Sequence, residues 1–365
     1  MALRKGQITL LTSADNVADA RLHRLTNAIL KNGMQVDIWA LGNVSDAPAG
    51  SNFHRAPGGK GKFARIFRDL ILPFKATGEV VIVVAPDLIP LTYLVTRMRG
   101  QKLVADVHED YLQLLRDRAW AKGIVGSLAK VIAKSATYFA AKADLTTVAD
   151  AQVPPFNATR RMVVKNLPDA SLITPSGELS ANPRAIYIGD IRKSRGLHLM
   201  LEVADNLPDW SFDLIGNIAD YELEFVKNWQ KNSPASSRVT FHGRLSPKDS
   251  WKFAEGAWVG LTLLEPTPAF VEAVPSKLYE YAAAGLATIS TPLPRCVELI
   301  KQSGGGEIAG SSEEISGLLS SWAKNPAPLK AMRQKALTWS QEVLKSEEQY
   351  AAFASAIRSL TTLTR

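Results

Sequence analysis

Glu272–Ser290, EAVPSKLYEYAAAGLATIS, places a proline, a lysine and two glutamates around the start of a short apolar run. Pro275 precedes the run and Gly285 follows it, a pattern that predicts a helix beginning near Ser276. The strand-like LATIS follows directly. This order of helix, turn and strand is typical of a parallel α/β sheet.

The same stretch contains the groups that an anionic ligand needs. The first turn of a helix presents unpaired N–H groups and a partial positive charge, and Lys277 adds a full cation there. A diphosphate fits this arrangement. Glu280, one turn further on, is placed to accept hydrogen bonds from a ribose, and Glu272 from the hydroxyls of a second sugar. An ordinary helix with two solvated glutamates is the alternative interpretation.

The whole chain alternates strand and helix patterns, which favours doubly wound parallel sheets. Helical periodicity separates the strand candidates, as in ADARLHRLTNAILKNG, which ends at Gly33. The strand candidates are Ile8–Leu11, Val36–Leu41, Val80–Ala85, Lys102–Val107, Leu145–Ala149, Val163–Lys165, Ala185–Gly189, Phe212–Gly216, Val239–Gly243, Val259–Leu264 and Ala287–Thr291.

A chain of 365 residues is long for one core, so we expect two domains. The polar stretch ASLITPSGELSANPR, which follows Pro168, has the composition of a linker. The sequence therefore predicts a first domain over 1–170, a linker over 171–183 and a second domain over 184–340, with a last helix in 341–365.

Several ordered segments carry a resemblance to a known family. The Glu-x₇-Glu spacing around PSKLYEYAAAG is similar to the donor-site motif of glycosyltransferase family 4, whose retaining enzymes have the two-domain GT-B fold. KLVADVHEDY resembles the Asp-x-His-Glu segment of one branch of that family. The other matching segments are AIYIGDIRKSRGLHLMLEVA (Ala185–Ala204), WSFDLIGN (Trp210–Asn217), VTFHGRLS (Val239–Ser246) and VVKNLPD (Val163–Asp169), and together they cover most of the chain.

The resemblance implies a role for particular positions, with the donor on the second domain and the acceptor on the first. Catalytic positions are His108 and Glu272, and the acceptor candidates are Asp19 and Arg21. Asp190 stands where many members have arginine, and Arg192 is placed to compensate. The implied donor-binding residues are Gly189, Arg192, Arg195, Gly216, Asn217, Gly243, Arg244, Leu245, Ser276, Lys277, Leu278 and Glu280.

Charge is divided unequally, since residues 1–170 carry a net +9 and residues 171–365 a net −1. Much of the excess lies in GGKGKFARIFRDLILPFK, where apolar residues at helical spacing alternate with Lys60, Lys62, Arg65, Arg68 and Lys75. One interpretation is a helix that buries its apolar face on the sheet. The other is docking to anionic lipid or to a lipid-linked pyrophosphate acceptor.

Composition excludes several classes of protein. No apolar run reaches membrane-spanning length and no signal-peptide pattern opens the chain, so we expect a cytoplasmic protein, peripheral at most to the inner face of the cytoplasmic membrane. The single Cys296 excludes an internal disulfide, and the five histidines lack metal-ligand spacing. There is no Asp-x-Asp, so we expect neither a catalytic metal nor another cofactor, and no motif accompanies the basic charge to indicate nucleic acid.

Three other functions fit parts of the pattern. A nicotinamide dehydrogenase has similar sheets, but no Gly-x-Gly-x-x-Gly follows the first strand of either half. A sugar-nucleotide epimerase with the GT-B architecture would bind the same donor. A sugar-nucleotide-binding or membrane-associated partner subunit without turnover is the non-enzymatic alternative. The sequence therefore predicts a retaining transferase of sugar from a nucleoside diphosphate sugar to a glycan, lipid-linked or small-molecule acceptor. The epimerase and the partner subunit are the alternatives that stay open.

Overall fold

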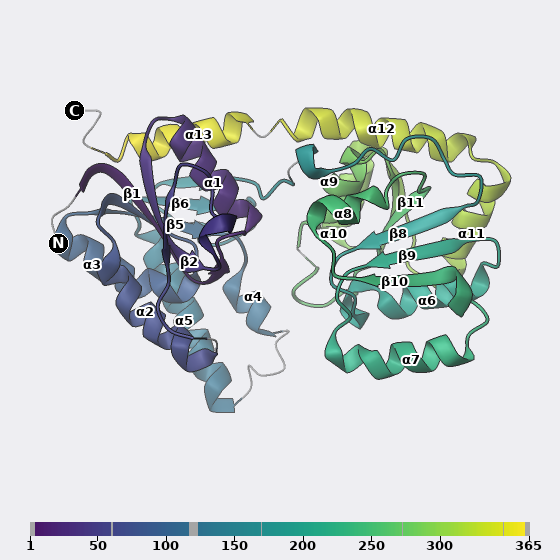
Figure 1. The fold of residues 1–365 in the computed structure, drawn as a ribbon, viewed down its shortest axis with the longest axis horizontal. Helices are drawn as coiled ribbons and strands as arrows, with labels where there is room; N and C mark the ends of the chain where they lie inside the picture. The colour runs from purple at the N-terminus through teal and green to yellow at the C-terminus, as the bar shows by residue number, and fades with distance from the viewer. Residues whose placement is uncertain are drawn as a thin grey trace. The chain divides into compact units, whose positions relative to one another are not determined.

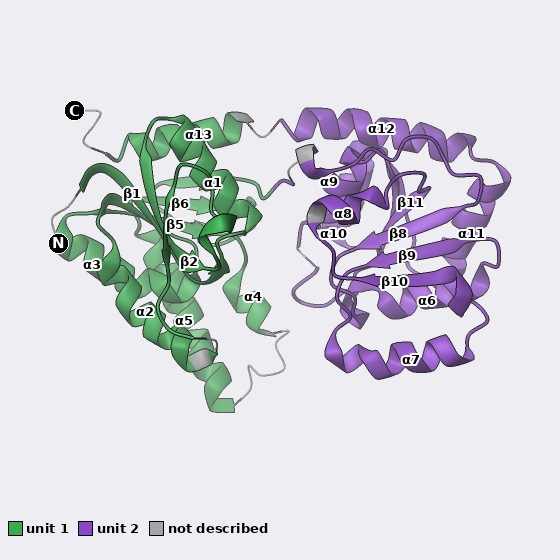
Figure 2. Ribbon diagram, viewed as in Figure 1, with its two compact units in different colours: residues 1–166, 346–365 green, residues 167–345 purple. Residues whose placement is uncertain are grey.

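A computed structural model describes residues 4–59, 61–116, 123–168, 170–271, 273–345 and 347–361. The chain divides into two compact units, residues 1–166 with 346–365 and residues 167–345 (Figure 2). Residues 171–183, the expected linker, are part of the second unit, and the last helix belongs to the first. Each unit contains a parallel sheet with helices on both faces (Figure 1), so the α/β doubly wound prediction is confirmed.

The first unit has a seven-stranded sheet with the order β3-β2-β1-β4-β5-β6-β7, all parallel. The strands are β1 (Arg4–Asn16), β2 (Gln35–Leu41), β3 (Asn52–Arg55), β4 (Gly78–Val83), β5 (Lys102–Val107), β6 (Leu145–Val148) and β7 (Arg161–Val163). The helices are α1 (Ala20–Lys31), α2 (Lys62–Lys75), α3 (Ile89–Arg99), α4 (Tyr111–Arg116), α5 (Gly123–Ala141) and α13 (Glu347–Arg358).

Alternate residues of the central strands enter two separate apolar layers. Val80 and Ile82 pack with α1 and α13, whereas Val81 and Val83 pack with α2, α3 and α5. Burial on both faces explains why these strands are nearly continuous apolar runs. Helix α13 packs against α1 and contributes Phe353, which is fully buried, so the end of the chain completes the core of the first unit.

The second unit has a six-stranded parallel sheet with the order β10-β9-β8-β11-β12-β13. Its strands are β8 (Arg184–Ile188), β9 (Ser211–Ile215), β10 (Val239–Gly243), β11 (Val259–Thr262), β12 (Ala287–Ser290) and β13 (Gly306–Ile308). Its helices are α6 (Leu197–Asn206), α7 (Leu223–Asn232), α8 (Pro247–Lys252), α9 (Ser276–Ala283), α10 (Pro294–Ser303), α11 (Ser312–Lys324) and α12 (Ala327–Val343). The register pairs Ile188 with Ile215, so the turns that follow β8 and β9 are neighbours.

The structure of helix α2 contradicts one of the two interpretations of the basic segment GGKGKFARIFRDLILPFK. The helix forms where the spacing predicts it, but its apolar stripe does not face the sheet. Phe63 is 89% exposed and Leu70 58%, and the other large apolar residues of the stripe are exposed or half-buried. The burial of this stripe on the sheet was therefore a wrong prediction, because Arg68 and Leu72 occupy the buried side instead. Lys60 lies outside the described residues.

Candidate functional site

Three glycine-containing turns lie side by side at the carboxyl edge of the second sheet. Strands β8, β9 and β10 are neighbours, and each ends at one of these turns. The N–H of Gly189 donates to the carbonyl of Ile215 (2.8 Å), and the N–H of Gly216 donates to the carbonyl of Gly243 (2.9 Å). The structure thus brings together three of the positions expected to bind a donor.

Gly189 and Gly216 permit a close approach that no other residue allows. A Cβ built on Gly216 would lie 1.8 Å from the carbonyl oxygen of Gly189. A Cβ on Gly189 would lie 2.5 Å from Nζ of Lys277. The two glycines therefore let the turns touch and leave the space beside Gly189 to a lysine side chain from α9.

Helix α9 is the helix that the sequence predicts after Pro275. It begins at Ser276 after Pro275, whose extended backbone caps the helix without a side-chain hydrogen bond. The first turn contains no acidic residue, so no side chain of that turn neutralises the partial positive charge of its N–H groups. Leu278 is 4% exposed and its side chain is part of the core, so only its backbone can reach a ligand.

Lys277 extends from α9 to the β8 turn and is only half-buried. Its Nζ lies 5.3 Å from the centre of the Tyr187 ring, and no described residue forms a salt bridge or hydrogen bond with it. Burial lowers the pKa of Lys277, the Glu280 carboxylate opposes that shift, and the Arg195 cation adds to it. A cation in this position is stabilised by any anion that binds beside it.

Two arginines from the β8–α6 connection complete the positive cluster. The Nε atoms of Arg192 and Arg195 are buried and have no hydrogen-bond partner among the described residues. The Arg195 guanidinium lies 5.8 Å from the centre of the Phe270 ring. Burial raises the pKa of Tyr187 to about 12, against the effect of Arg195, so its hydroxyl stays neutral and donates to the carbonyl of Asp190 (2.8 Å).

The remaining donor candidates surround this cluster. Glu280 is half-buried within α9, and Ser276 is half-buried at the start of that helix. Asn217 has an exposed side chain, while its carbonyl accepts from the N–H of Ile191 (2.9 Å). Two further candidates, Arg244 and Leu245, are exposed directly after β10. Glu272, the expected ligand of the transferred sugar, lies outside the described residues.

Asp19 and Arg21, the acceptor candidates, have structural partners in the first unit. The Asp19 carboxylate caps α1 by accepting from the N–H groups of Arg21 and Leu22. The Arg21 guanidinium is buried and donates to both oxygens of Asp106, each at 2.7 Å, and to the carbonyl of Val164 at 2.9 Å. Burial alone would raise the pKa of Asp106, but the Arg21 cation outweighs it and holds that pKa below its usual range. A role toward an acceptor stays a prediction.

His108 lies at the carboxyl end of β5, as the sequence predicts. Its ring is half-buried, and its Nδ1 atom is buried without a hydrogen-bond partner among the described residues. The hydroxyl of Tyr111, three residues further along the chain, is also buried without a hydrogen-bond partner among the described residues. Buried polar atoms usually have partners, so this edge of the first sheet has capacity for a ligand or a water.

The sequence did not indicate a pair of carboxyl groups that lies at the same edge of the first sheet. Asp69 of α2 lies beside Asp87, which follows β4, and one oxygen of Asp69 is buried without a partner among the described residues. Burial and the neighbouring Asp87 raise the pKa of Asp69 to about 7. Asp87 also accepts from the Ser13 hydroxyl (3.2 Å) and pairs with Arg65. The sign of this pair in the sequence was an acidic residue, Asp69, within an apolar helix.

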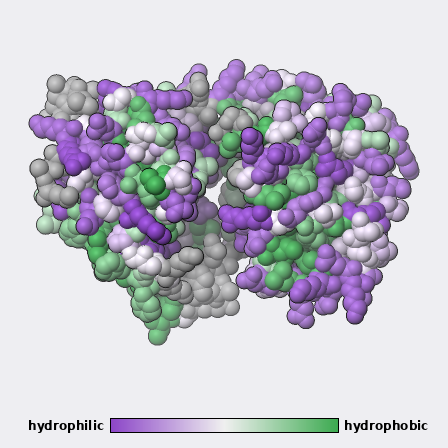
Figure 3. All heavy atoms as spheres, in the orientation of Figure 1, coloured by the Kyte–Doolittle hydropathy of each residue, from purple (hydrophilic) through white to green (hydrophobic). Residues whose placement is uncertain are grey.

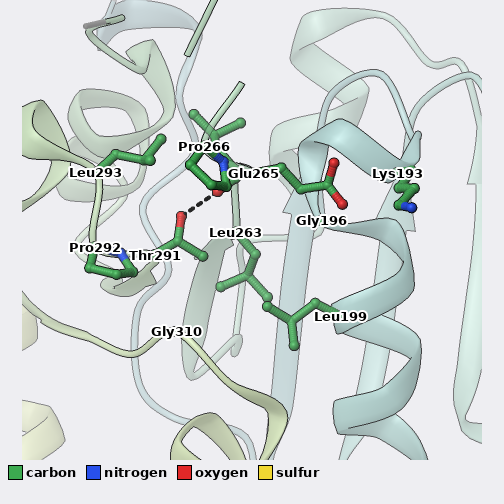
Figure 4. Close-up of a pocket in the computed structure, with 11 residues that line it drawn as sticks. Lys193, Gly196, Leu199, Leu263, Glu265, Pro266, Thr291, Pro292, Leu293 and Gly310 are labelled. Carbon is green, nitrogen blue, oxygen red and sulfur yellow. Dashed lines mark hydrogen bonds between the residues drawn. The ribbon is translucent and has the colours of Figure 1, made fainter. Parts of the chain in front are cut away.

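The second unit also contains a cavity of about 290 Å³ that the sequence did not indicate. It lies where β11 and β12 end and α6 begins (Figure 4), and none of the predicted donor residues lines it. The Thr291 hydroxyl donates to the carbonyl of Leu264 (2.7 Å) in its wall. The lining residues are Lys193, Gly196, Leu199, Leu263, Leu264, Glu265, Pro266, Thr291, Pro292, Leu293 and Gly310. In the sequence, only the position of these residues after two strands could have indicated the cavity.

The described parts of the chain contain neither a metal-binding cluster nor a membrane-spanning helix. No group of three or more His, Cys, Asp or Glu side chains there is arranged to hold a metal ion. No helix there combines the length and the apolar content needed to cross a bilayer. Cys296 is buried and unpaired, and burial raises the pKa of its thiol.

Comparison with solved structures shows the fold of the whole chain. Sucrose-phosphate synthase (tll1590) from Thermosynechococcus elongatus superposes with a TM-score of 0.75 at 13% identity, over 98% of this chain and 99% of that one. Anabaena Alr3699/HepE in complex with UDP gives 0.71 at 13% identity, over 98% and 100%. WaaG, described as a glycosyltransferase involved in lipopolysaccharide biosynthesis, gives 0.66 at 13% identity, over 95% and 98%.

Sequence comparison is informative for the second unit. Curated protein sequences gave no match to the chain. A family model described as "Glycosyl transferases group 1" matches residues 173–339, the range that holds the positive cluster of Arg192, Arg195 and Lys277. The chain therefore has the GT-B fold, and its second unit carries the sequence pattern of group 1 glycosyl transferases.

Proposed function

We propose that the protein is a retaining glycosyltransferase that uses a nucleoside diphosphate sugar and needs no metal. The observation that carries the proposal is the half-buried Lys277, beside Arg195 at the start of α9, which forms no hydrogen bond or salt bridge with an anion among the described residues. Two cations and a helix N-terminus suit a diphosphate. The group 1 match over 173–339 and the UDP and UDP-glucose named for HepE support this reading.

Departure of a nucleoside diphosphate places negative charge on its distal phosphate. Arg195 and Lys277 would stabilise that charge more strongly as it develops, which lowers the barrier. Glu280 would hold the ribose, and the turns at Gly216–Asn217 and Gly243–Leu245 would frame the base. The family resemblance assigns Glu272 to the transferred sugar and His108 to that sugar or the acceptor. The acceptor is a glycan, a lipid-linked intermediate or a small molecule.

Nucleotide binding tests the donor site directly. We expect one of UDP, GDP, ADP and TDP to raise the melting temperature of the purified protein, since a ligand at ~100 times its Kd stabilises the folded state by roughly 2.7 kcal/mol. Lys277→Ala should weaken that binding by 10-fold or more, because the phosphate loses a charge-assisted partner. Lys231→Ala, an exposed lysine on α7, is the matched control and should leave binding unchanged.

Product analysis separates the proposal from its alternatives. A retaining transferase gives a glycoside with the anomeric configuration of the donor sugar, measurable by NMR. An epimerase would return an altered nucleotide sugar without an acceptor, and a partner subunit would bind nucleotide with no turnover. Full turnover after exhaustive chelation supports metal independence, and loss of turnover that Mg²⁺ or Mn²⁺ restores would contradict it.

A further inference from the structure

Helix α2 has an inverted distribution of polar and apolar side chains. Its apolar side chains Phe63, Ile66, Phe67, Leu70 and Phe74 are between 49% and 89% exposed. Its inner side is polar as well as apolar, with the hydrogen-bonded Arg68 and the Asp69 carboxyl group. A surface helix of a soluble domain ordinarily turns its apolar stripe inward. Something other than the sheet of this unit is therefore needed to cover the stripe.

Polar contacts hold α2 in this orientation. Arg68 is 4% exposed and donates from Nε to the carbonyl of Ser13 (2.8 Å) and from Nη1 to the carbonyl of Gly59 (2.9 Å). Arg65 forms a salt bridge with Asp87, and Asp69 lies against the same carboxylate. A rotation that buried the apolar stripe would break all of these contacts. The exposure of the stripe is thus fixed by the fold of the unit.

Helix α5 repeats the inversion. Its buried positions are small residues, among them Gly126, Ala133, Ala136 and Ala140. Phe139 packs partly buried against the core, but most of the other large apolar residues of α5 face solvent. The exposed ones are Ile124 (89%), Val125 (56%), Leu128 (61%), Val131 (62%) and Ile132 (41%). Small residues allow α5 to approach the sheet closely, while the side chains that would normally drive burial point away from it.

Helix α3 connects the other two into one surface. It packs against both α2 and α5, and its Met98 is 85% exposed and its Leu94 50%. Figure 3 shows apolar atoms gathered along the edge of the first unit where these helices lie in Figure 1. We call the exposed apolar side chains of α2, α3 and α5 the outward apolar face. Contiguous apolar surface of this kind marks an interaction site.

Charge indicates what covers the outward apolar face. Of the eight lysines and arginines in the three helices, Arg68 is buried, and Arg65 and Arg97 pair with carboxylates. The one acidic residue, Asp69, is turned toward Asp87. Lys130 and Lys134 of α5 are exposed between its apolar residues, and Lys75 is exposed at the end of α2. A second copy of the chain in a two-fold dimer would bring the same cations together, and their repulsion opposes such a contact.

We propose that the outward apolar face docks on an anionic membrane surface, with the apolar side chains in the headgroup boundary and the lysines on the lipid phosphates. Apolar area and clustered cations are the two terms that bind interfacial helices. The proposal goes beyond glycosyl transfer, since it rests on the first unit alone and needs no donor or acceptor. It makes a surface-bound acceptor accessible to the protein without a spanning helix.

Vesicle sedimentation tests the charge term. The probe is the full-length protein with vesicles of phosphatidylcholine alone or with 30% phosphatidylglycerol, at low and at high salt. We expect binding to the anionic vesicles, weakened at least 10-fold by high salt and by Lys130→Glu with Lys134→Glu. The matched control is Lys227→Glu with Lys231→Glu, which has the same spacing and charge change on α7 and exposed side chains. It should bind like the wild type.

A second pair of variants tests the apolar term. Phe67→Ser with Leu70→Ser should weaken binding at least 10-fold while leaving the melting temperature unchanged, since both side chains are exposed. Val44→Ser with Tyr221→Ser changes two side chains outside the face that are even more exposed, at 74% and 72%, and vesicle binding should not change. No binding to anionic vesicles at low salt would overturn the proposal. So would a dimer in light scattering that the Phe67 and Leu70 changes dissociate, since a second copy would then cover the face.

Discussion

Arg21 and Lys277 are both cations at the carboxyl edge of a parallel sheet, and they differ in what surrounds them. Arg21 donates three hydrogen bonds, two to Asp106 and one to Val164. Lys277 has the Tyr187 ring and Gly189 beside it, and no anionic partner in contact among the described residues. A satisfied buried cation stabilises a fold, whereas an unsatisfied one costs stability and is available to a ligand.

Asp106→Ala should show the largest effect, because it leaves the Arg21 guanidinium buried without its carboxylate. We expect the free energy of unfolding of the first unit to fall by about 3–5 kcal/mol. Hydrogen exchange by mass spectrometry would place that loss in peptides of residues 4–59 and 61–116. Nucleotide binding, assigned to the other unit, should persist wherever the protein stays folded.

Asp213→Ala is the matched control in the second unit. Asp213 pairs with Arg184 at 2.7 Å and with His242 at 2.6 Å, but these two side chains are 21% and 20% exposed, and Arg184 also donates to the carbonyl of Phe253. Water can therefore replace part of the lost partner, and the loss should be roughly 1 kcal/mol. Equal losses for the two aspartates would mean that the Arg21 pair is no more than an ordinary surface salt bridge.

Gly216→Ala should damage the ligand edge rather than the core. Its Cβ would meet the carbonyl oxygen of Gly189, a backbone atom that cannot move without displacing the β8 turn from Lys277. Overpacking of this kind costs about 1–3 kcal/mol of stability. Separately, the displaced turn should lower nucleotide affinity by roughly 10-fold, which corresponds to about 1.4 kcal/mol of binding free energy. The measurement is isothermal titration with the nucleotide that the wild type binds.

Gly243→Ala separates the close contact from backbone strain. Gly243 has a φ of 69°, so alanine is strained there too, but no described atom lies within 4 Å of the added Cβ. Affinity should fall by only a few-fold. If both glycine variants lose affinity equally, the contact between Gly216 and Gly189 has no special part in binding.

Local patterns predicted the strands and the glycine turns after β8, β9 and β10 well, because glycine, proline and apolar runs act over a few residues. The Arg21–Asp106 pair spans 85 positions, and no short pattern connects its members. The sequence left open whether the apolar stripe of α2 is buried or exposed, and the reason is different. Periodicity in α2 predicts an apolar stripe but not its direction, which depends on the contacts of Arg65, Arg68 and Asp69 with distant segments.

Lys277→Met should separate stability from binding in the second unit. Replacing an unpaired, half-buried cation with an apolar side chain should leave the unliganded protein as stable or raise its stability by about 1 kcal/mol. Because the pKa of Lys277 is lowered in the folded state, its destabilising effect is present at neutral pH and disappears as the pH rises toward the ordinary 10.5. The advantage of the variant should therefore shrink between pH 7 and pH 10 in denaturant melts. A large loss of stability would mean that Lys277 has a structural partner.

Asp69 is the exception within the first unit, and it gives the smallest effect. Its pKa is raised from 3.8 to about 7, so the folded state holds a proton that the unfolded chain releases near pH 4. The stability that this proton provides is complete below pH 4 and is lost as the pH rises through about 7. Asp69→Asn keeps a neutral side chain of the same shape, so its stability relative to the wild type should rise between pH 5 and pH 8, on the order of 1 kcal/mol. Urea melts at the two pH values measure that difference. A pH-independent difference would mean that the Asp69 carboxyl is ionised throughout, and that the carboxyl edge of the first unit is as fully satisfied at Asp69 as it is at Arg21.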